Sequence, residues 1–183
     1  MEQPLVETEQ IRPILFQMLC VLAAFNDDRH PLPRDHNSEA IREDGKAADR
    51  LIEDYARFIL NSNLLLSAVS LRHLDDRQDR RLLNGEISFA VFVEDGEVRG
   101  LTLREACNKI IHSDRFWFEA ETSRGDQIAG QQSALRLGNR VTAIVLEGSR
   151  FRSDTPIEWA VDINDPIRLI CAMIRACEAA DRR

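Results

Sequence analysis

The sequence lacks an apolar run long enough to cross a bilayer. Its main apolar run near the N-terminus is "ILFQMLCVLAAF" at 14–25, well short of the about 20 residues that a membrane helix requires. The preceding residues include Glu2, Glu7 and Glu9 but only one arginine, whereas a signal peptide begins with positive charge. We therefore expect a core helix at this position, no membrane segment, and a cytoplasmic protein.

An excess of positive charge is lacking as well. The 183 residues include 24 Lys and Arg against 31 Asp and Glu, which gives a formal net charge of −7. Proteins that bind nucleic acid regardless of its sequence present a strongly basic surface. The composition therefore argues against binding of that kind, and it leaves room only for a local basic groove.

Paired cysteines are also missing. The four cysteines, Cys20, Cys107, Cys171 and Cys177, form no CxxC pair. A structural zinc site needs clustered ligands at short spacing. Because each cysteine lies in an apolar, helix-like setting, we expect buried, reduced thiols.

Motifs that hold cofactors are not found. The glycine-containing segment 123–132 has no lysine where a phosphate-binding loop requires one, and no GxSxG motif occurs. The segment "DDRHPLPRDH" (27–36) carries carboxylates and two histidines that resemble metal ligands. Its prolines and irregular spacing are more typical of a solvated loop. We therefore expect neither a cofactor nor a metal.

The N-terminal part of the chain reads as helical. Apolar spacing predicts a helix over 10–26, with Pro13 in its first turn, where a missing N–H is harmless. A charged loop over 27–45 should follow. A second helix should run from Lys46 to about Leu83, weakened at 61–63 by side chains that compete for backbone hydrogen bonds.

After residue 85 the pattern changes to alternating apolar residues. Asp95-Gly96 predicts a tight hairpin turn, and Thr102 and Glu105 have the spacing of a capping box that starts a helix over 103–112. Asp165-Pro166 should cap a last helix over 165–181. The expected strands are 86–101 (as a hairpin), 115–121, 140–148 and 157–163. This order predicts one α+β domain over 1–183, with N-terminal helices packed with a small antiparallel sheet and a C-terminal helix.

One polar stripe stands out within the capped helix. Arg104, Asn108 and His112 recur at four-residue intervals, so they lie on one helix face. A histidine titrates near neutrality and can act as a general acid or base. The alternative is that His112, beside Asp114 and Arg115, is a helix cap or a member of a salt bridge.

The segment "CNKIIH" (107–112) resembles the RNxxxH motif of the HEPN family. Asn108 and His112 match the motif, Cys107 stands where the family has arginine, and Arg104 is the nearest substitute. The resemblance implies an all-helical, commonly dimeric bundle, often linked to bacterial toxin–antitoxin or antiviral defence systems. Many members are metal-independent endoribonucleases in which the motif arginine and histidine of two subunits act on the RNA 2′-hydroxyl and the scissile phosphate.

Carried over to this chain, the resemblance implies a catalytic set. His112 would be the acid and base, Arg104 or Arg115 would hold the phosphate, and Asn108 would orient them. Lys109, Arg115 and Arg72 are the expected RNA-binding cations. Arg72 begins "RHLDDRQDRR" (72–81), whose mixed charges at helical spacing are more typical of a solvent-exposed face with side-chain pairs.

Two functions therefore remain open. The first is a HEPN-related RNA-binding protein or metal-independent endoribonuclease of a bacterial defence or toxin–antitoxin system, and the intact spacing of Asn108 and His112 favours it. The second is a non-catalytic helical interaction protein that forms a homodimer or binds a partner protein. Cys107 in the place of the motif arginine favours the second.

Overall fold

The computed structural model describes residues 8–26, 39–121, 127–128, 139–152 and 155–182. The fold in these ranges is α+β, as the order of predicted elements indicated. The helices are α1 (Thr8–Asn26), α2 (Glu39–Arg77), α3 (Leu103–His112) and α4 (Pro166–Asp181), and the strands are β1 (Glu86–Glu94), β2 (Glu97–Thr102), β3 (Arg115–Glu121), β4 (Gln127–Ile128), β5 (Arg140–Arg152) and β6 (Thr155–Ile163).

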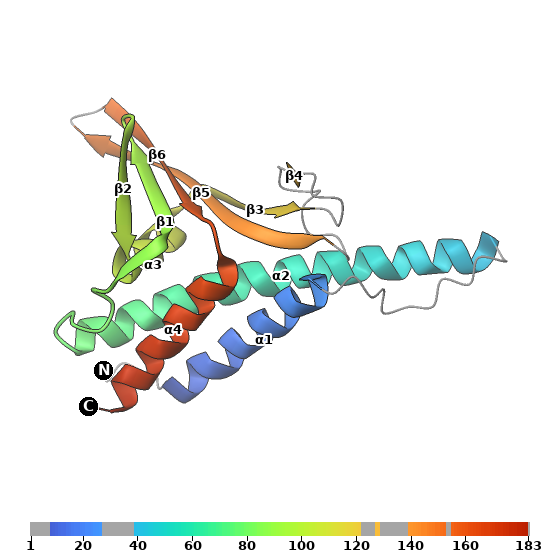
Figure 1. Cartoon of the computed structure of the whole chain (residues 1–183), viewed down its shortest axis with the longest axis horizontal. Coiled ribbons are helices and arrows are strands. Elements are labelled where there is room, and N and C mark those ends of the chain that lie inside the picture. Colours follow the sequence, from blue (N-terminus) through green and yellow to red (C-terminus); the bar gives the residue numbers. More distant parts are fainter. Residues whose placement is uncertain (1–7, 27–38, 122–126, 129–138, 153–154, 183) are drawn as a thin grey trace.

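The strands form one sheet in the order β2-β1-β6-β5-β3-β4, and every neighbouring pair is antiparallel. Figure 1 shows the helices together on one side of this sheet. The sheet residues that face the helices are buried, among them Phe92, Leu146 and Val161. The opposite face, called here the open face, carries the half-buried side chains of Val91, Val93, Trp117, Val145, Ala160 and Asp162.

Helix α2 differs from its prediction at both ends. It begins at Glu39, inside the expected loop, and it continues through 61–63 without a break. Packing explains the continuity, because Leu60 and Leu64 on either side of this stretch are fully buried. The helix ends at Arg77 rather than near Leu83. Two left-handed residues, Asp79 (φ 52°) and Arg80 (φ 60°), turn the chain there.

Two expectations about single residues in the helices were wrong. Pro13 lies in the interior of α1 rather than in its first turn, because the helix begins at Thr8. Of the cysteines, Cys107 and Cys177 are buried, but Cys20 is exposed and Cys171 is half-buried. Helical periodicity did not separate the packed faces of α1 and α4 from their outer faces at these two positions.

The predictions based on local chemistry were confirmed. Asp95 (φ 51°) and Gly96 (φ 79°) form the turn between β1 and β2, with the positive φ angles that a tight hairpin needs. Thr102 and Glu105 form the complete capping box of α3, and the Asp165 carboxylate accepts a hydrogen bond from the Arg168 amide at the start of α4. The short strand β4 was not predicted, and β5 extends to Arg152.

Candidate functional site

The candidate site begins with a buried carboxylate at the end of α2. The Asp75 side chain is fully buried, although its segment was expected to be solvent-exposed. Its Oδ1 accepts hydrogen bonds from the amides of Leu82 (2.8 Å) and Leu83 (3.1 Å). Its backbone carbonyl accepts from the amides of Gln78 and Arg80. Asp75 therefore terminates α2 and shapes the turn that follows.

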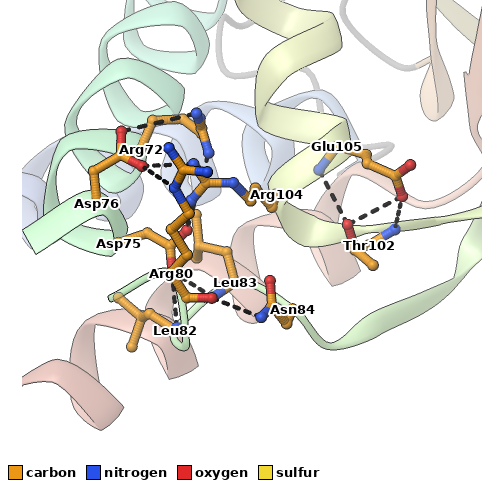
Figure 2. A network of polar contacts seen from close by, with 10 residues as sticks. All are labelled: Arg72, Asp75, Asp76, Arg80, Leu82, Leu83, Asn84, Thr102, Arg104 and Glu105. Atoms are coloured by element: carbon orange, nitrogen blue, oxygen red, sulfur yellow. Dashed lines mark hydrogen bonds and ion pairs between the residues drawn. The ribbon is translucent and has the colours of Figure 1, made fainter. Parts of the chain in front are cut away.

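The predicted catalytic arginine is part of this cluster. One terminal nitrogen of Arg104 donates to Oδ2 of Asp75, and the other donates to Asp76 at 2.5 Å. Arg72 lies at 3.8 Å from Asp76 and 4.0 Å from Asp75. Figure 2 shows the two guanidinium groups meeting these carboxylates between α2 and α3. The arrangement holds the start of α3 against the end of α2.

The N-terminus of α3 has its first donors occupied. The amides of Leu103 and Arg104 donate to the carbonyls of Gly85 and Leu83, at 3.0 and 2.9 Å. The Glu105 amide donates to the Thr102 hydroxyl oxygen, and the Glu105 carboxylate accepts from the Thr102 amide, as Figure 2 shows. These contacts leave little of the helix terminus to bind an anion.

Lys109, an expected RNA-binding residue, is enclosed by aromatic rings. Its ammonium lies 4.2 Å from the ring centre of Phe92 and 3.8 Å from that of Trp159. The Trp159 ring in turn lies against Gly148, where a Cβ atom would approach it to 2.2 Å. Burial is the main cause of the lowered pKa of Lys109. This cation therefore packs α3 onto the sheet.

His112 lies at the far end of α3 from the ion pairs of Arg104. His112 follows Arg104 by eight positions, which is about 12 Å along a helix axis. His112 is exposed and Asn108 is half-buried. The site thus brings Arg104 together with Arg72, and it directs the Arg104 guanidinium toward α2 rather than toward His112.

A cavity of about 360 Å³ lies beside the C-terminal end of α3, between α2 and β3. Its lining includes Asn61, Ile110, Asp114 and Arg115, but not His112. Arg115 is paired with Glu147 at 2.8 Å. The cavity therefore has apolar walls and a charged rim, and one of the expected RNA-binding cations lies at that rim.

Cys107, at the position of the motif arginine, is fully buried beneath Arg72 and Arg104. Burial raises the pKa of its thiol to about 12, against the lowering effect of the two nearby guanidinium groups. A thiol with such a pKa stays protonated near neutrality and is a poor nucleophile. Cys107 therefore acts as a small apolar residue of the core.

Comparison with known proteins identifies no relative. No family model, no curated protein and no solved structure matches this chain. The HEPN resemblance accordingly rests on residues 107–112 alone, and it stays a prediction.

The described residues contain no group of three or more His, Cys, Asp or Glu side chains placed to hold a metal ion. The segment 27–36, considered above as a metal-binding loop, lies outside the described residues. None of the helices in the described ranges is long and apolar enough to cross a membrane.

A second feature, on α2, was not recognised as a site from the sequence. Opposite its buried residues, α2 carries exposed apolar side chains, called here the α2 stripe, and one of them, Leu65, also lines the cavity beside α3. The stripe consists of Leu51, Ile52, Tyr55, Phe58, Leu65 and Leu66. Leu51 is 71% exposed and Phe58 is 65% exposed, and the Tyr55 and Phe58 rings stack with centres 6.5 Å apart. The signal was the seven-residue spacing of Leu51, Phe58 and Leu65.

Proposed function

We propose that this protein is a non-catalytic interaction protein that forms a homodimer through the α2 stripe. The observation that carries the proposal is the set of exposed, large apolar side chains on α2, which form two groups, Leu51 to Phe58 and Leu65 to Leu66, about two helical turns apart and away from the buried residues Leu60 and Leu64. Large exposed apolar patches mark interaction sites on soluble proteins. The ion pairs of Arg104 and the burial of Cys107 favour this function over catalysis.

The stripe is suited to pairing with a second copy. Phe58 lies at its centre, with Leu51 and Ile52 on one side and Leu65 and Leu66 on the other. A two-fold axis passing near Phe58 would place the α2 helices antiparallel, with the leucines of one end facing those of the other. Such self-complementarity is what a closed dimer requires. The repeat of seven residues is the spacing at which paired helices keep their apolar seam in contact.

The size of the stripe also fits a dimer. Its six side chains together expose about as much as three fully exposed large residues, or roughly 700 Å² on one copy. Pairing two copies could then bury at most about 1,400 Å² of these side chains. Stable, specific interfaces bury about 1,200–2,000 Å² in total. The stripe alone therefore supplies an interface of ordinary size.

The test is the oligomeric state in solution. Sedimentation velocity of the wild-type chain should show a dimer, and Phe58→Glu should shift it to a monomer because the substitution places two carboxylates at the axis. Phe16→Glu is the matched control, since Phe16 on α1 is also 65% exposed but lies outside the stripe. We expect this variant to remain dimeric.

A wild-type monomer at concentrations of about 100 µM would reject the homodimer, because interfaces of standard size have affinities between about micromolar and picomolar. A dimer that both substitutions dissociate, or that neither affects, would assign the interface to another surface. Circular dichroism of each variant establishes that the fold is retained.

A second candidate is an RNA-binding or RNA-cleaving activity of the HEPN kind, in a bacterial defence or toxin–antitoxin setting. The observation that favours it is that His112 is exposed at the end of α3 and that Asn108 precedes it by one helical turn. An exposed imidazole can exchange protons with a substrate. Arg115, three positions further along the chain, would supply a cation for the phosphate in place of its pairing with Glu147.

RNA cleavage in the presence of EDTA tests this candidate. Metal-independent cleavage by the wild-type chain should be lost in His112→Ala and kept in His73→Ala, because His73 is an exposed histidine on another helix. Absence of cleavage by the wild type would reject the nuclease. Equal cleavage by His112→Ala would show that this histidine is not its acid or base.

A further inference from the structure

One row of side chains on the open face of the sheet crosses four strands. Register pairs Val91 of β1 with Asp162 of β6, Asp162 with Val145 of β5, and Val145 with Trp117 of β3. Directly paired residues of antiparallel strands point to the same side of a sheet. Asp162 is therefore a carboxylate with an apolar neighbour on each side, at the centre of the face.

In the part of the chain that the structure describes, no hydrogen bond or ion pair compensates the partial burial of the Asp162 carboxylate. Its Oδ1 is buried and has no hydrogen-bond partner. Burial raises the pKa of Asp162, and no charged group contributes to the shift. In the adjacent row of the same face, the cation among the described residues is Arg115, and it is already paired with Glu147 at 2.8 Å. A carboxylate that is half-buried, with one buried oxygen that lacks a partner, lowers the stability of the free protein, so its presence points to a cation supplied from outside.

The dimensions of the face indicate the kind of occupant. Four neighbouring strands span about 14 Å at the usual spacing of about 4.8 Å, and a helix with its side chains is about 10–12 Å wide. The apolar residues around Asp162 include Trp117, a residue type that often dominates binding energy at interfaces. A helix is also what covers a sheet face in α+β folds.

Other occupants fit less well. The described residues of this face include no group of three or more side chains placed to hold a metal ion. A second copy placed face to face would bring the two Asp162 side chains together near the axis, where like charges repel. Nucleic acid would meet the carboxylates of Asp162 and Glu119 with its phosphates, and these charges also repel.

We propose that the open face of the sheet binds an amphipathic helix of a partner protein, whose apolar side carries one arginine or lysine that pairs with Asp162. The inference is independent of the α2 dimer, because the α2 stripe lies on the helical side of the molecule. The apolar row gives the contact area, and the carboxylate selects the partner by its charge.

The probe is a phage-displayed library of amphipathic helical peptides, randomised on one face and selected against the wild-type full chain. Enriched peptides should carry one arginine or lysine among apolar residues. Asp162→Asn should weaken the binding of a synthetic representative by about 30-fold or more, the usual effect of removing one partner of a desolvated charge pair. Replacing the peptide cation with norleucine should weaken binding to the wild type far more than binding to Asp162→Asn.

Two control variants separate the outcomes. Glu119→Gln removes a carboxylate from the same face, and Phe58→Glu alters the α2 stripe; both should bind the peptide as the wild type does.

Since the pKa of Asp162 is raised in the folded state, its ionisation lowers stability as pH rises. Asp162→Asn should therefore melt at the wild-type temperature or higher at pH 7, so a loss of binding is not unfolding. The proposal is overturned if no peptide is enriched, if enriched peptides lack a cation, or if Asp162→Asn binds them equally.

Discussion

Two aspartates of this chain show how differently the same residue is accommodated. Asp75 is fully buried, and two amides and the Arg104 guanidinium compensate its charge. Asp162 has a buried oxygen without a partner and lies between two valines. The first joins two helices and a turn, whereas the second is left for an external cation. At the scale of single residues, the available partners decide between a structural and a binding role.

Replacement of Asp75 tests its structural role. Asp75→Ala should lower the free energy of unfolding by about 3–5 kcal/mol, because it leaves a half-buried guanidinium and two amides without their acceptor. Asp76→Ala is the control, since Asp76 also contacts Arg104 but its side chain is 46% exposed. That substitution should cost no more than about 1 kcal/mol. Urea denaturation measures both values, and equal losses would contradict the assigned role.

At the scale of elements, α3 is the best-defined unit of the chain. Its capping box closes on itself within four residues, and its first two amides are bonded to the turn after α2. Lys109 and the ion pairs of Arg104 then attach it to the sheet and to α2. The polar stripe predicted from the sequence, Arg104, Asn108 and His112, therefore does not act as one unit. Arg104 pairs with α2, and His112 alone of the three is exposed.

The pH dependence of stability tests the capping box. Burial would raise the pKa of Glu105, but hydrogen bonds from Thr102 and the charge of Arg99 outweigh it and lower the pKa below its ordinary value of 4.5. A lowered carboxylate pKa contributes stability that is present above the ordinary value and is lost as pH falls through the folded-state value. Glu105→Gln should therefore be less stable near neutrality.

The same variant should lose less stability than the wild type when pH falls from about 5 to about 3. Thermal melts across this range measure the difference. Glu97→Gln, which changes an exposed carboxylate of β2, should follow the wild-type profile. Parallel profiles for Glu105→Gln and the wild type would show that the carboxylate contributes nothing as an ion.

At the scale of the whole molecule, the two proposed surfaces lie on different layers. The α2 stripe belongs to the helical layer, and the open face is the side of the sheet that the helices leave uncovered (Figure 1). A homodimer formed through α2 would therefore present two open faces. Two linked copies of a weak binding surface hold a bivalent partner more tightly than one copy does.

The sequence by itself determined the features that depend on neighbours within a few residues. The hairpin turn at Asp95-Gly96, the capping box of Thr102 and Glu105, and the Asp165 cap of α4 were all confirmed. Each rests on a backbone angle or a hydrogen bond that closes locally. The α+β class followed from the order of these elements along the chain.

Only the tertiary structure decided the features that join distant segments. Helix α2 is apolar on two sides, and periodicity reveals that Leu60 and Leu64 share one side and Leu51 and Phe58 another, but not which side the other helices and the sheet cover. In the same way, the mixed charges of "RHLDDRQDRR" predict a solvent-exposed face. The tertiary structure instead buries Asp75, because Arg104 of α3 pairs with it. Burial depends on which surfaces pack together in three dimensions, and the spacing of residues along one helix does not predict which of its apolar sides is packed.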